Sequence, residues 1–456
     1  MLTLVSFILA LGLLIAIHEY GHYKVAVLCG IKVLKFSIGF GKPIYSWRLR
    51  GKPTEFSIGL LPLGGYVKML DEREAPVDAA ERHLAFNTQP LKCRAAVVAA
   101  GPIANLLLAI ILYTGLNWSG LQEPKAVLAS PTVGSVAEKA GLRGTELVKA
   151  AAFEGQAMEP VRSFEDLRWR LMQGALNGRN VRMAVQDNKS SDTNSSTREV
   201  MLVFQDFNAT EVDAQFFRNI GIVGPWTAPV IGGIVANGPA AKGGLQSGDT
   251  VLRVGQTQIV DGQQLRQLIR TSTETAASAQ TWQVSRGANV LDIQMTPRVV
   301  NEGKTSVAKI DASVGAAPEF VTVRYGMFEG LLQGVSRTWD SSVLTLKMMG
   351  KMLIGEASLK NLSGPLTIAD YAGKSAAIGL TAYLLFLAAI SVSLGVLNLL
   401  PLPVLDGGHL MYYLWEAVTG KTVSDAWMGG LQRGGVAILL GMMSVALFND
   451  VTRLFG

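Results

Sequence analysis

Four apolar stretches stand out along the chain, each long enough or nearly long enough to cross a membrane. Residues 95–116 carry no charged side chain over 22 positions, and residues 376–400 carry none over 25. A spanning helix needs about 20 apolar residues. Residues 2–28 qualify if the polar cluster inside them faces protein, and residues 434–448 need their flanks to reach the length. The pattern predicts a multi-pass α-helical membrane protein with four transmembrane helices.

The region between the second and third apolar stretches reads as soluble sequence and contains an internal repeat. SVAEKAGLRGTELVKA at 135–150 resembles GPAAKGGLQSGDTVLRV at 238–254, and a helical pattern follows each copy. A period near 100 residues indicates tandem domains. The unit resembles the PDZ domain, a small β-sandwich-like α+β module that takes peptides by strand addition. A generic β domain with a Gly-Asp turn is the alternative.

The two copies differ in their turns and loops. Gly144-Thr145-Glu146 in the first copy stands where Ser247-Gly248-Asp249 stands in the second, so we expect the first turn to be built differently. The first copy also carries a polar, low-complexity stretch at 186–199, which is typical of a flexible loop.

A β-rich loop and an amphipathic segment complete the predicted architecture. Residues 36–67 contain glycine-punctuated β-like runs, which indicate a membrane-associated β-hairpin or sheet after the first helix. Apolar residues recur at helical spacing within 320–360. We interpret that segment as a helix on the bilayer surface or on the helix bundle, with a core helix of the insert as the alternative.

The predicted domains follow one another along the chain. They are the first transmembrane helix (1–28), a cytoplasmic or membrane-associated β-rich loop (29–94), the second helix (95–118), PDZ domain 1 (119–220), PDZ domain 2 (221–300), a linker with the amphipathic helix (301–375), the third helix (376–412), and the fourth helix with the tail (413–456).

Composition and charge agree with this division. The chain is 49% hydrophobic and 17% charged, with a mean hydropathy of +0.30, whereas soluble proteins carry about 25% charged residues. The net charge of +6 is modest and does not indicate nucleic-acid binding. Eleven Lys/Arg against six Asp/Glu between residues 29 and 94 favour a cytoplasmic loop. Two cysteines exclude a disulfide framework, and the N-terminus lacks the basic region and cleavage site of a signal peptide.

His18, Glu19 and His22 form H-E-x-x-H inside the first apolar stretch. Residues i and i+4 share one face of a helix, so both imidazoles can bind one Zn²⁺. Glu19 lies one position away and can act as general base on a water molecule. Ionisable groups in a membrane helix are costly and usually functional. A pair of packed histidines is the alternative, but it leaves three such groups unexplained.

A catalytic zinc site needs a third protein ligand. Residues 29–94 offer no suitable helix for it. The best candidate is Asp406, just beyond the third apolar stretch, in a segment where Pro401 and Pro403 interrupt the helix. His409 is a rival ligand.

Taken together, these motifs resemble those of the site-2 proteases, which are intramembrane metalloproteases. HEYGH in a first span and Asn398, Pro401, Asp406 and Gly407 in a late one carry the resemblance. The double PDZ insert, NLSGP at 361–365 and FNTQPLKCRAAVVAAGPIAN at 86–105 resemble the regulator-of-sigma-E branch of that family. The resemblance covers nearly the whole chain.

The resemblance implies a zinc endopeptidase that cuts transmembrane segments of single-pass membrane proteins within the lipid bilayer. Substrates of that branch are an anti-sigma factor already trimmed by another protease, and remnant signal peptides. One Zn²⁺ per chain would be held by His18, His22 and Asp406, with Glu19 as base and Asn398 binding substrate. The expected location is a bacterial inner membrane, with periplasmic PDZ domains and the active site toward the cytoplasm.

An extended substrate also needs a partner strand, because amides locked in a helix cannot be hydrolysed. We expect a strand edge beside the zinc to pair with it. The residues expected to bind substrate there are Gly39, Gly41, Ser57, Ile58 and Gly59. An ordinary cytoplasmic hairpin is the alternative.

Three other functions compete with proteolysis. A non-catalytic PDZ membrane scaffold predicts no metal, a PDZ-bearing serine protease needs a nucleophile motif that the chain lacks, and a zinc transporter needs more intramembrane carboxylates.

Overall fold

The computed structural model describes residues 1–51, 53–187, 197–205, 214–272, 279–302, 305–355 and 364–455. Most of the polar stretch at 186–199 and residues 361–363 of NLSGP lie outside the described residues. The chain forms two compact units, which are Met1–Gly120 with Arg324–Gly456, and Leu121–Val323.

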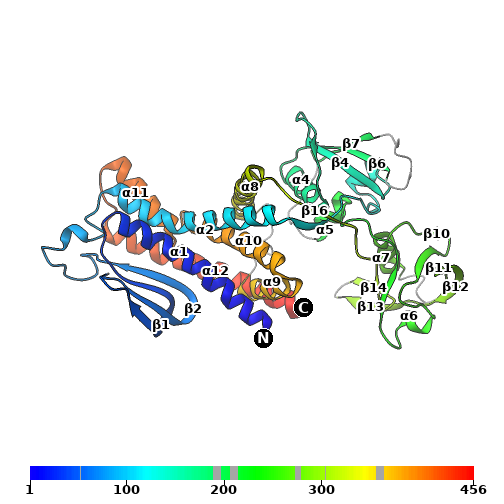
Figure 1. The fold of residues 1–456 in the computed structure, drawn as a ribbon, viewed down its shortest axis with the longest axis horizontal. Helices are drawn as coiled ribbons and strands as arrows, with labels where there is room; N and C mark the ends of the chain where they lie inside the picture. The colour runs from blue at the N-terminus through cyan, green and yellow to red at the C-terminus, as the bar shows by residue number, and fades with distance from the viewer. Residues whose placement is uncertain are drawn as a thin grey trace. The chain divides into compact units, whose positions relative to one another are not determined.

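Four helices among the described residues of the first unit are long and apolar enough to cross a membrane (Figure 1). They are α1 (Leu2–Leu28), α2 (Leu91–Ser119), α10 (Leu380–Asn398) and most of α12 (Asp425–Phe455), whose apolar part is Ala426–Thr452. The four expected spans therefore correspond to four helices, and the chain is a multi-pass membrane protein.

The third span differs from the range 376–412 expected for it. Helix α9 (Pro365–Ile378) ends at Gly379, whose φ of 139° suits only glycine, and α10 starts directly after it. Helix α10 then ends at Asn398, and the Pro-containing segment 399–405 separates it from α11 (Asp406–Thr419). Because proline cannot donate an amide to a helix, this segment leaves Asp406 at the start of a new helix.

Small residues let α1 and α2 approach closely. A Cβ on Gly21 would overlap the carbonyl oxygen of Ala100 and lie 2.8 Å from Cβ of Ala104. Apolar side chains gain nothing by leaving lipid, so membrane helices associate through such close backbone contacts. This approach brings the polar face of α1 against α2.

Helix α8 (Met327–Leu353) is the amphipathic helix expected within 320–360. It belongs to the first unit and packs on α2, so it is not a core helix of the insert. Gly330 and Gly334 face α2, where a Cβ on Gly330 would lie 2.7 Å from Cδ1 of Trp118. The opposite face exposes large apolar side chains, including Phe328 and Trp339.

Strands β1 (Val33–Arg48) and β2 (Glu55–Met69) form a bent antiparallel sheet after α1. Each strand bends, so each contributes two segments. Residues 33–38 pair with 65–69 on one side and with 55–58 on the other, and 55–59 also pair with 43–48. The segments 43–48 and 65–69 are therefore the two edges of this sheet. The short 3₁₀ helix η1 (Arg82–Leu84) lies between the sheet and α2.

The second unit contains two four-stranded sheets with the same strand order. The first is β5-β4-β6-β7 and the second is β10-β9-β11-β12. Each half has its own buried core, one drawn from residues 126–222 and the other from residues 231–310. Each half also has a helix with a polar N-cap, α4 (Phe164–Leu176) capped by Ser163 and α7 (Gly262–Thr271) capped by Asp261.

The strands and short helices of this unit have the following bounds: β3 Leu121–Pro124, α3 Val136–Lys139, β4 Glu146–Phe153, β5 Glu159–Pro160, β6 Val181–Asp187, β7 Arg198–Leu202, α5 Ala214–Ile220, β8 Ile231–Ile234, α6 Pro239–Lys242, β9 Thr250–Val254, β10 Thr257–Gln258, β11 Gln280–Arg286, β12 Asn289–Met295, β13 Arg298–Glu302, β14 Thr305–Lys309, β15 Ala312–Val314 and β16 Phe320–Val323.

The insert continues beyond residue 300, where its second domain was expected to end. Strand β15 pairs with β8, and β16 pairs with β3 at the start of the insert. The repeat alone could not predict this, because β15 and β16 lie C-terminal to the repeated segments.

The two turns differ in backbone but share a hydrogen-bonding role. Thr145 has a φ of 74° beside Gly144 at 91°, whereas Gly248 supplies the positive φ in the second copy. Glu146 and Asp249 each accept the amide of the residue three positions earlier. Hydrogen bonds from Arg286 hold the pKa of Asp249 below its usual value.

Candidate active site

Helix α1 and the start of α11 bring together the three residues expected to bind zinc. His18 Nε2 lies 3.2 Å from Asp406 Oδ2, and His22 Nε2 lies 3.6 Å from the same oxygen. The two Nε2 atoms are 3.2 Å apart. Ligands about 2.0–2.1 Å from a tetrahedral zinc ion are separated by about 3.3–3.4 Å. The three atoms therefore have the spacing and the chemistry of one face of a zinc coordination shell.

Glu19 is buried next to this cluster but is not part of it. A Cβ on Gly65 of β2 would lie 2.8 Å from Glu19 Cγ, so the sheet covers this side chain closely. Glu19, His22 and Asp406 line one cavity of about 860 Å³. The carboxylate thus lies beside a space large enough for water, next to the candidate metal-binding cluster.

Helix α2 holds His22 in place. The carbonyl oxygen of Val97 lies 2.8 Å from His22 Nδ1, so that nitrogen carries the proton and Nε2 is free to bind a metal. Gly101 lies against both imidazoles. A Cβ there would overlap His22 Nε2 and lie 2.8 Å from His18 Cε1. Only glycine leaves room for the two rings at this position.

Two glycines fix Asp406 at the first turn of α11. A Cβ on Gly407 would overlap the carbonyl oxygens of Leu399 and Leu400, and one on Gly408 would overlap that of Leu402. The segment 399–405 therefore wraps tightly around the start of α11. This close packing sets the direction of the Asp406 carboxylate.

His409 does not join the cluster. Its Nδ1 lies 3.4 Å from the carbonyl oxygen of Leu405, and its ring contacts Tyr412 edge-on at 5.9 Å between centroids. It lines the cavity as a neighbour of Asp406. Of the two rival ligands, the structure brings Asp406 to the histidines.

The residues expected to bind substrate are not all near the candidate metal-binding cluster or free to pair with another strand. Asn398 is the last residue of α10, half-buried, and is not among the described residues that line the cavity. Gly39 and Gly41 have φ values of 92° and 86° and form the bend of β1. Ser57 and Ile58 pair on both sides, with Ser37 and Ile38 and with Ser46 and Tyr45.

The open edge beside Glu19 and the His18–His22–Asp406 cluster is therefore not at residues 57–59 but at Gly65–Met69. Those residues pair only with β1 among the described strands. Val67 and Met69 line the cavity together with Glu19. The alternating β pattern could not identify this edge, because the pairing depends on the bends at Gly39 and Gly41.

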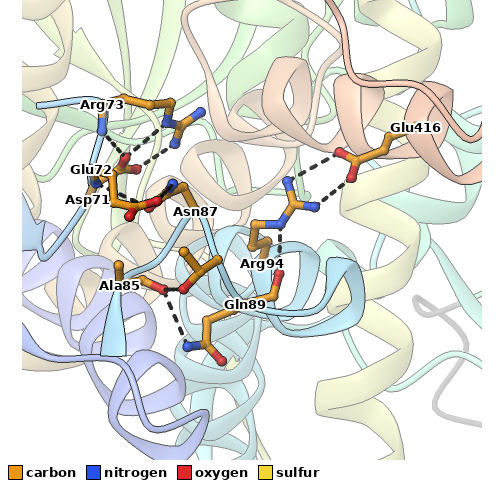
Figure 2. A network of polar contacts seen from close by, with 9 residues as sticks. Asp71, Glu72, Arg73, Ala85, Asn87, Gln89, Arg94 and Glu416 are labelled. Atoms are coloured by element: carbon orange, nitrogen blue, oxygen red, sulfur yellow. Dashed lines mark hydrogen bonds and ion pairs between the residues drawn. The ribbon is translucent and has the colours of Figure 1, made fainter. Parts of the chain in front are cut away.

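The cavity is also lined by Asp71, Arg73 and Asn87, which belong to a polar network on the loop between β2 and α2 (Figure 2). Arg73 donates to both carboxylate oxygens of Asp71, and Asn87 donates to Glu72 at 2.9 Å. Burial alone would raise the pKa of Asp71, but the hydrogen bonds from Arg73 outweigh it and hold that pKa below its usual value.

One ion pair joins α2 to α11 at this end of the cavity. Figure 2 shows Arg94 forked onto the Glu416 carboxylate, at 2.6 Å and 3.2 Å, while its Nε donates to the Gln89 carbonyl. Both side chains are less than one-fifth exposed, and Arg94 also lies over the Tyr413 ring at 5.2 Å. The pair fixes α11 two to three turns beyond Asp406.

Reversing one charge of this pair should therefore loosen α11. We expect Arg94→Glu to destabilise the fold by about 3–5 kcal/mol, because it leaves two partly buried carboxylates facing each other. The double variant Arg94→Glu with Glu416→Arg should recover most of the lost thermal stability in detergent. The matched control is Arg48→Glu, which breaks an exposed pair with Glu55 and should cost less than about 1 kcal/mol. Equal losses for the two single variants would contradict the anchoring role.

Comparison with known proteins places the chain in a family. The model of peptidase family M50 matches residues 6–442. The chain is 39% identical to a protein of Ralstonia nicotianae named as a zinc metalloprotease, over 100% of this chain and 99% of that protein. It is 38% identical to the regulator of sigma E protease of Haemophilus influenzae, covering 99% of both chains. It is 37% identical to the regulator of sigma-E protease RseP of Escherichia coli, covering 99% of this chain and 98% of the other. The chain therefore belongs to peptidase family M50 and is an intramembrane zinc metalloprotease of the site-2 type.

Proposed function

We propose that the chain cuts the transmembrane segment of single-pass membrane proteins that another protease has already trimmed. An anti-sigma factor and remnant signal peptides are the proposed substrates, since two of its relatives are named as regulators of sigma E protease. The observation that carries the proposal is the His18–His22–Asp406 cluster, which lies at zinc-ligand spacing beside a buried glutamate.

We assign the following roles to the residues of the site. His18, His22 and Asp406 would hold one zinc ion per chain, which would supply Lewis-acid activation of a water molecule. Glu19 takes a proton from that water on its carboxylate and later returns it to the leaving amine of the cut peptide.

The edge of β2 at Gly65–Met69 is proposed to hold the substrate. An unwound substrate adds as a strand to this edge, and main-chain hydrogen bonds fix it irrespective of its side chains. The edge lies beside Glu19 and lines the same cavity, so an added strand is brought to the metal ligands. We propose that the bend at Gly39 and Gly41 supports this edge and contributes to substrate binding. We also propose that Asn398 contacts the substrate.

The location and the insert complete the proposal. The basic loop 29–94 favours the cytoplasmic side for the sheet and the metal ligands, in a bacterial inner membrane. The second unit then lies in the periplasm, and we propose that its two halves are PDZ domains. Their common strand order, separate cores and N-capped helices support this.

The substrate proposal is tested in cells whose only copy of the chain carries Glu19→Gln. A membrane-anchored protein should accumulate as a fragment that has lost its outer domain but keeps its transmembrane segment. Restoring the wild-type chain should clear the fragment. If the fragments accumulating in the two strains were the same, the proposed substrate class would be wrong.

The strand-edge proposal predicts position-dependent effects of proline. Single proline substitutions at Tyr66, Val67 and Lys68 each remove one main-chain amide proton. Where that amide faces away from the sheet, cleavage should slow by about three- to tenfold, since one hydrogen bond to the substrate contributes about 1 kcal/mol. Alternate amides of an edge strand face away from the sheet, so neighbouring positions should differ. Proline at Ser46, on the opposite edge, is the control and should leave cleavage and zinc content unchanged. Uniformly normal rates across 66–68 would argue against strand addition here.

A further inference from the structure

The two zinc-binding imidazoles differ in what faces their second nitrogen. His22 Nδ1 has the backbone carbonyl of Val97, which can only accept a hydrogen bond. His18 Nδ1 instead has a side-chain amide, with Asn105 Nδ2 at 3.3 Å. Asn105 lies on α2 one turn beyond Gly101, within a span that carries no charged side chain from 95 to 116.

Asn105 is almost completely buried, at 1% exposure, and its Oδ1 has no hydrogen-bond partner among the described residues. Its backbone is held from the other side, where the Ser391 hydroxyl of α10 donates to the Asn105 carbonyl at 2.7 Å. A buried amide oxygen without a partner costs free energy, and more so in a membrane span. Oδ1 of Asn105 therefore needs a hydrogen-bond donor at this position.

Zinc on His18 Nε2 requires the ring proton to be on Nδ1. Nδ1 then donates, so the group facing it must accept. An asparagine amide carries a donor and an acceptor that exchange places when the amide turns by 180°. With Oδ1 turned toward His18, the amide meets this need at the same site.

We propose that Asn105 is the positioning residue of His18. Its Oδ1 accepts the Nδ1 proton when zinc is bound and holds the imidazole with Nε2 toward the metal. The proposal rests on the assignment of His18 as a zinc ligand, which is part of the proposed function. Acceptors behind a metal-binding histidine typically contribute about 10–100-fold to metal affinity.

The test is the zinc dissociation constant of the purified full-length chain, measured by competition with a chelating indicator. Asn105→Leu keeps the size but removes the acceptor, and we expect it to weaken zinc binding by about 10–100-fold. Asn105→Asp keeps an acceptor oxygen and should bind at least as tightly as wild type. Ser391→Ala removes the neighbouring hydrogen bond to the Asn105 backbone and serves as the control, with affinity within about twofold of wild type.

A second measurement separates this role from a general loss of packing. The chain has four histidines, so ¹⁵N-labelled histidine gives few ring signals. In the zinc-bound wild type, His18 should show a slowly exchanging Nδ1 proton, which Asn105→Leu should lose while His22 keeps its own.

Different results would overturn the role of Asn105 and the zinc site itself. Zinc affinity of Asn105→Leu equal to that of wild type, or an Asn105→Asp variant as weak as Asn105→Leu, would overturn the role of Asn105 alone. A zinc affinity of His18→Ala equal to that of the wild-type chain would overturn the proposed zinc site itself.

Discussion

Glu19→Gln is expected to abolish cleavage while zinc stays bound. Glutamine has nearly the same shape as glutamate but cannot take a proton from water, and loss of a general base costs about 10²–10⁴-fold in rate. Glu19 is not among the three clustered ligand atoms, so the metal should remain. The measurement is the cleavage rate of a single transmembrane substrate in detergent, with zinc content determined on the same sample.

His18→Ala is the matched control for this prediction. It removes a ligand one position away on the same helix, so zinc content and cleavage should fall together. If Glu19→Gln lost zinc to the same extent, Glu19 would be acting as a ligand. If it kept a cleavage rate within tenfold of wild type, the proton would be moved by another group.

Gly101→Ala is expected to destroy the metal site although it adds one methyl group. That carbon would overlap His22 Nε2, the atom proposed to bind the metal, and crowd His18 Cε1 at 2.8 Å. Neither ring has room to retreat, because α1 and α2 are already in close backbone contact at Gly21. We expect at least a 100-fold loss of zinc affinity, about 2.7 kcal/mol or more, since displacement of an imidazole removes a whole ligand.

Gly115→Ala provides the comparison on the same helix. A Cβ there meets nothing within 4 Å among the described residues, so zinc binding and cleavage should stay near wild type. This control removes helix propensity as a cause, since alanine favours a helix at both positions. Retained zinc in Gly101→Ala would show that the two helices can separate at no large cost.

The clustered residues His18, His22 and Asp406 could be predicted from sequence because each is chemically conspicuous. His18, Glu19 and His22 interrupt an apolar helix with the spacing of an H-E-x-x-H zinc-binding motif. Asp406 is the lone acid beside a long uncharged stretch. The spans follow from length and hydropathy alone. Both kinds of signal are local, so a single sequence carries them.

What sequence could not supply depends on contacts between distant segments. Asn105 is one amide in an apolar helix, and nothing in its neighbours indicates that His18 lies opposite it. Gly101 looks like any glycine of a tightly packed span. The free edge at Gly65–Met69 follows from a pairing register set by two bends, and a strand pattern with period two is equally compatible with an inner segment.

The separation of the ligands along the chain has a consequence for biosynthesis. His22 and Asp406 are 384 positions apart, and a ribosome adding about 5–20 residues per second needs about 20–80 s to cover that distance. The first helix thus enters the membrane long before the third ligand exists. A nascent or prematurely terminated chain shorter than 406 residues would hold only two of the three proposed ligands, so it would enter the bilayer without a complete metal site and without protease activity.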